Sequence, residues 1–291
     1  MTFRLLALLI ALALVATVPL VRSWRDLRWF DHWITLCEST RGIGRVLLVL
    51  APPAILAAIL GIVFSSAVWL AIVWLAFAVL VLICTLGPRY LEADIEAVLA
   101  ADDTPSRIAA AQALRVHADD DAALPLTSAA LVEAAMLSAL KRRFGVVFWF
   151  LLLGPGGAVL YRLAQRLGEH ADTDAESRGA ARRFAEGMDW PASHLMVFAM
   201  ALVSDFDAVI GAWRAWHRSP TRSPWTFESG FLGAVARASV NADVEAGDEG
   251  MADTDTSDPM LELTDTRHLL LRVLLVWLAV MAVLVLASWL A

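Results

Sequence analysis

The sequence predicts an all-α, polytopic helical membrane protein with about four transmembrane helices and a large helical middle region. Hydrophobic residues make up 59% of the 291 positions and charged residues only 18%, which is more apolar than an ordinary soluble protein. The mean hydropathy of +0.65 agrees with this class. No stretch alternates apolar and polar residues as a half-buried strand would. We therefore expect helices throughout.

Four segments carry the roughly 17–25 apolar residues that a helix needs to cross a bilayer. A helix is the expected form because lipid offers no partners to backbone polar groups and a helix pairs them internally. Arg272, near the start of the last segment, can extend its guanidinium to the interface. The four segments are Leu5–Val21, Val46–Phe64, Ala67–Leu86 and Leu269–Ala291.

The first two segments contain features that need separate interpretation. Arg22, Arg25 and Arg28 directly follow the first segment, and a basic cluster there favours a retained anchor over a cleaved signal peptide. Pro52 and Pro53 lie in the second segment. Because proline lacks a backbone N–H, we expect a kink and one or two carbonyls that need another donor.

The basic residues also predict the orientation. The loop 22–45 carries five arginines, whereas Ser65-Ser66, between the second and third segments, carries no charge. The first is expected in the cytoplasm and the second outside. Residues 88–268 contain many more arginines, so the middle of the chain should be cytoplasmic and both termini external.

These assignments divide the chain into four parts. Residues 1–87 hold three transmembrane helices, and 88–241 form a helical core that is cytoplasmic or re-entrant. Residues 242–266 hold nine Asp or Glu and no Lys or Arg, a composition typical of a flexible linker. Residues 267–291 form the last helix. The net charge of −7 thus gathers late in the chain, which argues against a nucleic-acid partner.

Residues 148–162, FWFLLLGPGGAVLYR, are apolar but interrupted by Gly154-Pro155-Gly156-Gly157. A full crossing here would place the following arginines outside, against the positive-inside bias. A backbone break at membrane depth is tolerated only where protein or a water-filled cavity satisfies the exposed groups. We predict two short helices that meet at a bend, buried or re-entrant.

Residues 193–213 are apolar apart from a few positions near their middle, including Asp205 and Asp207. Either this helix turns its acids into a cavity, or its apolar part ends at Val203, because aspartates facing lipid are costly. Upstream, Asp189-Trp190-Pro191 predicts a helix start, with Asp189 as the cap and Pro191 in the first turn.

The bend is the most site-like place in the chain. Free N–H groups at a helix start with nearby arginines suit a phosphate or carboxylate, and the aspartates could hold a cation or an amine. The alternative is a tight helix crossing with interfacial arginines. No catalytic or metal-binding residue is assigned. The candidate ligand-binding residues are Arg142, Arg143, Gly154, Gly156, Gly157, Tyr161, Arg162, Asp189, Asp205 and Asp207.

Two further groups of polar residues have simpler interpretations. His170, Asp172 and Asp174 form a spaced triplet, which is typical of a solvated loop. A headgroup-facing belt is the simpler interpretation of Trp216, His217, Arg218 and Trp225, and an interface position at a helix start is that of His194.

The order of several motifs resembles the AmpE family of Gram-negative inner-membrane proteins, which is related to the CobD/CbiB membrane enzymes of cobalamin biosynthesis. These motifs are Lys141-Arg142-Arg143-Phe144, Phe148-Trp149, Gly154-Pro155-Gly156-Gly157-Ala158, Tyr161-Arg162, Asp189-Trp190-Pro191 and Asp205-Phe206-Asp207. The resemblance covers most of the chain. After Tyr161-Arg162 and at residues 228–231 the sequence departs from the amide-forming enzymes, which favours the AmpE branch.

The resemblance implies an inner-membrane sensor, signalling or accessory protein linked to peptidoglycan recycling and to the regulation of β-lactamase induction. It implies membrane lipid and cell-wall recycling components as partners, and ATP or another phosphate-bearing ligand as the class of cofactor. The sequence contains no Gly-x-x-x-x-Gly-Lys-Ser/Thr loop, so ATP would need an unrelated site. The alternatives are a membrane-bound amide-forming enzyme and a structural membrane scaffold.

Overall fold

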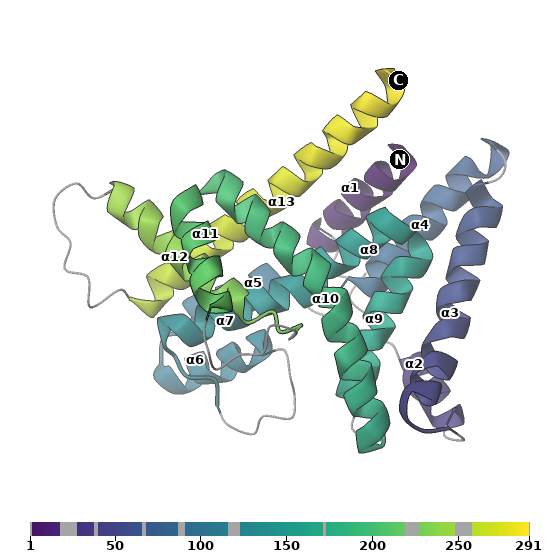
Figure 1. Cartoon of the computed structure of the whole chain (residues 1–291), viewed down its shortest axis with the longest axis horizontal. Helices are drawn as coiled ribbons and strands as arrows, with labels where there is room; N and C mark the ends of the chain where they lie inside the picture. Colours follow the sequence, from purple (N-terminus) through teal and green to yellow (C-terminus); the bar gives the residue numbers. More distant parts are fainter. Residues whose placement is uncertain are drawn as a thin grey trace. The chain divides into compact units, whose positions relative to one another are not determined.

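The computed structural model describes residues 2–17, 28–37, 40–65, 68–86, 91–115, 123–170, 173–218, 227–247 and 258–290, and every regular element in these ranges is helical (Figure 1). The predicted all-α class is confirmed. The chain divides into two compact units. Unit 1 comprises Met1–Tyr90, Lys141–Met188 and Met281–Ala291, and unit 2 comprises Leu91–Leu140 and Asp189–Val280.

Within the described ranges, two helices are long and apolar enough to cross a membrane, judged by length and composition. They are α3 (Gly42–Ser65) and, within α13 (Pro259–Leu290), the stretch Pro259–Ala287. The other two predicted spans form shorter apolar helices, α1 (Thr2–Thr17) and α4 (Ala71–Thr85). A four-span arrangement is therefore not confirmed. The first predicted span runs on to residues outside the described ranges, and α4 is preceded by a 3-10 turn, Val68–Leu70.

Unit 1 is built on α3 and α9 (Pro155–Glu169), which pack against each other, with α8 (Gly145–Leu153) and α4 also beside α9. The short α2 (Arg28–Leu36) precedes α3. The prolines of α3 lie inside the helix, as predicted. Pro53 removes the N–H that would bond to the carbonyl of Val49, and the indole N–H of Trp33 donates to that carbonyl at 3.1 Å instead. The expected need for an outside donor is confirmed.

Unit 2 contains two helix pairs whose starts the sequence marks. α5 (Leu91–Leu99) packs on α6 (Thr104–Ala111), and Asp103 caps α6 by accepting from the N–H of Ser106. α7 (Ser128–Ala139) packs on α12 (Phe231–Gly247), where a Cβ on Gly233 would lie 2.7 Å from the Cβ of Glu133. Only a glycine allows these two backbones to approach so closely.

Two sequence expectations about helix boundaries are corrected. Pro191 does not start a helix, and Asp189 is not a cap: both lie inside α10 (Ala175–Val203), where Asp189 is buried. The helix continues through this proline, and the preceding turn contacts α8, where the indole N–H of Trp149 donates to the carbonyl of Met188 at 3.0 Å.

The predicted linker 242–266 is helical at both ends, since α12 continues to Gly247 and α13 begins at Pro259. Residues 248–257, between them, lie outside the described residues. Asp258 supports the start of α13 by accepting from the N–H of Met260 at 2.9 Å, as a side chain at a helix start commonly does. The acidic residues 262 and 265 therefore belong to a helix.

Candidate functional site

The bend at Gly154 joins two short helices, α8 and α9, as predicted. Gly154 has φ +76°, a conformation that a residue with a Cβ rarely adopts. Pro155 follows and cannot donate to the carbonyl of Leu151. Arg4 of α1 fills this role, because its Nη1 donates to the Leu151 oxygen at 2.7 Å. The break is thus covered by a guanidinium from another helix.

Gly156 and Gly157 begin α9 and face protein. A Cβ on Gly156 would lie 2.7 Å from the Cβ of Ala58 and 2.9 Å from the carbonyl oxygen of Ala54, both in α3. A Cβ on Gly157 would lie 2.5 Å from the carbonyl oxygen of Trp149 in α8. The contacts of these two glycines are those of a tight helix crossing, the alternative that the sequence left open.

The basic candidates gather where the chain enters α8. Leu140–Phe144 form a π-helical turn that carries Arg142 and Arg143, and such turns are frequent at functional sites. Gly145, which follows, has no room for a side chain because the buried ring of Tyr161 occupies the position of its Cβ. This contact fixes the π-helical turn against α9.

Arginines dominate the electrostatics of this corner. Burial lowers the pKa of the Arg162 guanidinium, the carboxylate of Glu169 opposes that shift, and the positive charges of Arg142 and Arg166 add to it. The side chain of Arg143 is also buried. Planar guanidinium groups are the side chains best suited to bind a phosphate or a carboxylate.

The three aspartate candidates belong to unit 2, whereas the other seven candidates belong to unit 1. Asp205 is exposed and caps α11 (Phe206–His217), accepting from the N–H of Ala208 at 2.6 Å. Asp207 is exposed in the first turn of α11, where an acidic residue favours the helix dipole. The apolar helix therefore ends at Val203, which is the second of the two alternatives for residues 193–213.

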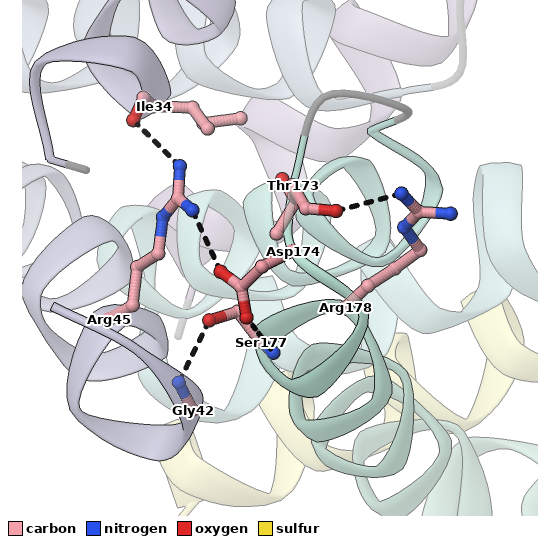
Figure 2. A network of polar contacts seen from close by, with 7 residues as sticks. All are labelled: Ile34, Gly42, Arg45, Thr173, Asp174, Ser177 and Arg178. Carbon is pink, nitrogen blue, oxygen red and sulfur yellow. Dashed lines mark hydrogen bonds and ion pairs between the residues drawn. The ribbon is translucent and has the colours of Figure 1, made fainter.

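A polar cluster in unit 1, which we call the α3–α10 latch, was not predicted as a site (Figure 2). It consists of Gly42, Arg45, Asp174 and Ser177. Asp174 precedes α10 and accepts from the N–H of Ser177 at 2.9 Å, and from the guanidinium of Arg45 at 2.9 Å. The hydroxyl of Ser177 accepts from the N–H of Gly42 at 2.9 Å. The latch joins the starts of two helices far apart in the sequence.

The charge state of the latch is well defined. The N–H and hydroxyl of Ser177, together with Arg45, lower the pKa of Asp174 to about 2, although burial acts in the opposite direction. The Arg45 side chain is 6% exposed and that of Asp174 is 30% exposed. The pair is therefore ionised at neutral pH and partly shielded from water.

A second ion pair lies in the same unit. Arg166 of α9 donates to both carboxylate oxygens of Asp31 in α2, at 3.0 and 2.7 Å. This two-pronged geometry is the strong form of an arginine–carboxylate pair. His170 lies 3.6 Å from the same carboxylate. Of the predicted loop triplet, His170 and Asp174 thus take part in helix contacts, and Asp172 lies outside the described residues.

Unit 2 contains a cluster of aromatic and imidazole rings from α10, α11 and α12. The ring centroids of His194 and His217 are 6.1 Å apart. The ring centroid of Phe231 lies 5.0 Å from that of His194 and 5.3 Å from that of His217. Each histidine Nδ1 lies 2.8 Å from the carbonyl oxygen four residues earlier, in Trp190 and Trp213. A carbonyl only accepts, so each Nδ1 is the donor in these hydrogen bonds.

Sequence reasoning missed the latch and Arg4 for a physical reason. The arginines of loop 22–45, Arg45 among them, indicated topology, and nothing in one sequence pairs residues 45 and 174 or residues 4 and 151. The available signal was Asp174 three residues before Ser177, a spacing typical of a helix start. In the part of the chain that the structure describes, no group of three or more His, Cys, Asp or Glu side chains could hold a metal ion.

Comparisons with protein-family models, with curated proteins and with solved structures give no match to this chain.

Proposed function

We propose that the protein is a multi-pass protein of the bacterial inner membrane that acts as a sensor, signalling or accessory component in peptidoglycan recycling and in the regulation of β-lactamase induction. The process comes from the motif order that resembles the AmpE family. The membrane location is supported independently by the apolar exposed residues of α3 and, separately, of α13. The exposure of such residues on these helices is the single observation that carries the proposal.

The outward surface of α3 is apolar along the helix. Ile43, Ile55, Leu56, Ile59 and Ile62 are between 51% and 72% exposed. Large aliphatic side chains in this number favour lipid over water, at about 25 cal/mol for each Å² removed from water. α13 has the same character, with Leu275, Val283 and Leu286 each more than 60% exposed.

The capping of freed carbonyls also supports a location with little water. Arg4 and Trp33 donate to carbonyls that Pro155 and Pro53 leave without their helical partner. In lipid an unsatisfied carbonyl costs several kcal/mol, so donors from neighbouring helices are expected there.

The location is tested by fractionation and by reporter fusions. Alkaline phosphatase, which is active outside the cytoplasm, should be active when fused after Ser66 or at the C-terminus, and a fluorescent protein should be bright when fused at residue 120. Recovery of the chain in the soluble fraction would refute the membrane location. The opposite reporter pattern would refute the orientation alone.

The process is tested by deleting the gene in a bacterium that carries it together with an inducible β-lactamase. Induction by a β-lactam, or the level of peptidoglycan fragments, should change and should return with the wild-type gene. Unchanged induction and unchanged fragment levels would refute the proposed process.

The alternative of a membrane-bound amide-forming enzyme that uses a nucleotide or a phosphate is favoured by one observation, the guanidinium groups around the π-helical turn. Purified protein with ATP and candidate amines should then consume nucleotide, and Arg143→Ala should abolish that turnover. Asp205→Asn, which keeps the helix cap, is the matched control and should retain it. The absence of turnover would refute this alternative.

A further inference from the structure

The second half of α10 has an apolar outward face in unit 2. Leu195, Phe198 and Leu202 are 43%, 57% and 71% exposed. They are spaced by three and four residues and so lie on one stripe of the helix. Trp190, 45% exposed, precedes them. Residues 190–203 contain no Asp, Glu, Lys or Arg.

The opposite face of the same segment is buried against unit 2. Met196, Val197, Ala199 and Met200 are each at most 3% exposed. The helix is therefore apolar on both sides, although only one side is covered by unit 2. A surface helix in water normally carries polar residues on its outer face. We therefore expect this stripe to contact something other than water.

A contact with α13 places the end of this stripe. The guanidinium of Arg272 donates to the carbonyl oxygen of Val203, the last residue of α10, at 3.5 Å. Arg272 is followed by the apolar stretch of α13 in which Leu275 is 64% exposed and Val280 50% exposed. An arginine at the edge of such a stretch extends to the membrane interface. The end of α10 thus lies at the level where α13 begins to face lipid.

The residues beyond Val203 fit an interface. Asp205 and Asp207 are exposed directly after it, which suits headgroups and water but not acyl chains. Trp190 and Trp213 belong to the ring cluster around His194, and amphipathic rings are enriched at headgroup level. The segment 190–203 is about 21 Å long at 1.5 Å per residue, which is too short for a hydrocarbon core of about 30 Å.

We propose that Leu195, Phe198 and Leu202 form a lipid-contact surface, with which the second half of α10 enters the bilayer only partway and anchors unit 2 at the membrane interface. Lipid fits better than a protein partner because the Arg272–Val203 contact places the end of the stripe beside the point where the exposed apolar residues of α13 begin. This inference rests on the proposed membrane location of the chain. It adds a surface that the two candidate spans do not contain.

The test measures the accessibility of spin labels in proteoliposomes. Phe198→Cys and Leu202→Cys are labelled, with Leu275→Cys of α13 as the lipid reference. Gly179→Cys of α10, where an added Cβ would meet nothing within 4 Å, is the water reference. Protein without an introduced cysteine gives the background from Cys37 and Cys84. Collisions with oxygen report lipid, and collisions with a soluble nickel complex report water.

The expected result is a ratio of oxygen to nickel accessibility at 198 and 202 that is several-fold above that at 179 and close to that at 275. A ratio like that at 179 overturns the lipid-contact surface, while a lipid-like value at 275 leaves the membrane location intact. Low accessibility to both reagents also overturns it, because a protein then covers the stripe. A water-like value at 275 overturns the membrane location itself.

Discussion

Removing the carboxylate of Asp174 should destabilise unit 1 in two separable steps. The carboxylate caps α10 through the N–H of Ser177 and pairs with the Arg45 guanidinium. Loss of a helix cap costs about 1 kcal/mol. A hydrogen bond to a charged group contributes about 1.5–3 kcal/mol, and we take about 1.5 kcal/mol because solvent partly screens Asp174.

The two contributions predict different results for two substitutions. Asp174→Asn keeps a good cap and should cost about 1.5 kcal/mol, whereas Asp174→Ala should cost about 2.5 kcal/mol. At about 2–4 °C per kcal/mol for a domain of 150–250 residues, Tm should fall by about 3–6 °C and about 5–10 °C. Thermal unfolding in detergent, followed by tryptophan fluorescence, measures both shifts.

A matched control isolates the contribution of Arg45. Asp205 also caps a helix, α11, and accepts from Ala208, with no ion pair among its described contacts. Asp205→Ala should therefore cost only about 1 kcal/mol. If Asp174→Asn unfolds at the temperature of the wild type, or Asp174→Ala costs no more than Asp205→Ala, the reasoning about the ion pair is refuted.

Three further predictions follow from the same contacts. Because the pKa of Asp174 is lowered to about 2, its contribution to the stability of the fold is complete above the unfolded pKa of about 4 and is lost as pH falls toward 2. The difference in Tm between the wild type and Asp174→Asn should therefore be constant from about pH 7 to about pH 5 and should shrink at lower pH. A difference that is undiminished near about pH 2.5 would contradict this reasoning. Gly156→Ala should lower Tm because its Cβ would meet Ala58 and the backbone at Ala54, at a cost of about 1–3 kcal/mol. Gly179→Ala is the control and should raise stability by up to about 1 kcal/mol. Equal shifts of Tm in the two variants would argue against the tight crossing. Trp33→Phe removes the donor to Val49 and should cost about 1 kcal/mol in the same assay, while an unchanged Tm would mean that the carbonyl finds another donor.

Local chemistry made much of the fold predictable from the sequence. The glycine break at 154 separates α8 from α9, and a proline of α3 leaves a carbonyl that takes another donor, both as the sequence predicts. Both depend on neighbours within a few residues. The same local reasoning failed at Pro191, because a proline that follows a capping residue fits a helix interior as well as a first turn, and the neighbouring residues do not distinguish the two.

The candidate site was less predictable because its contacts join distant parts of the chain. The sequence indicated that the Gly154 break needs a partner, but not that the partner is Arg4, which lies about 150 residues away. Likewise, Asp205 and Asp207 would be costly to place in lipid only if the apolar helix continued past Val203. Because α10 ends at Val203, Asp205 caps α11 and both carboxylates are exposed.

The glycines and the arginines around the bend therefore support different conclusions. Gly156 and Gly157 are explained by the crossing with α3 and α8, which needs no ligand. Arg142 and the buried Arg143 lie instead on the π-helical turn that leads into α8. For the alternative of a phosphate-using enzyme, we therefore expect the anion at the π-helical turn rather than at the glycine bend. Inorganic phosphate should raise the Tm of the wild type and leave the Tm of Arg143→Ala unchanged. Gly154→Ala, although less stable, should still show the rise. Equal rises in the wild type and Arg143→Ala would refute an anion site at the π-helical turn.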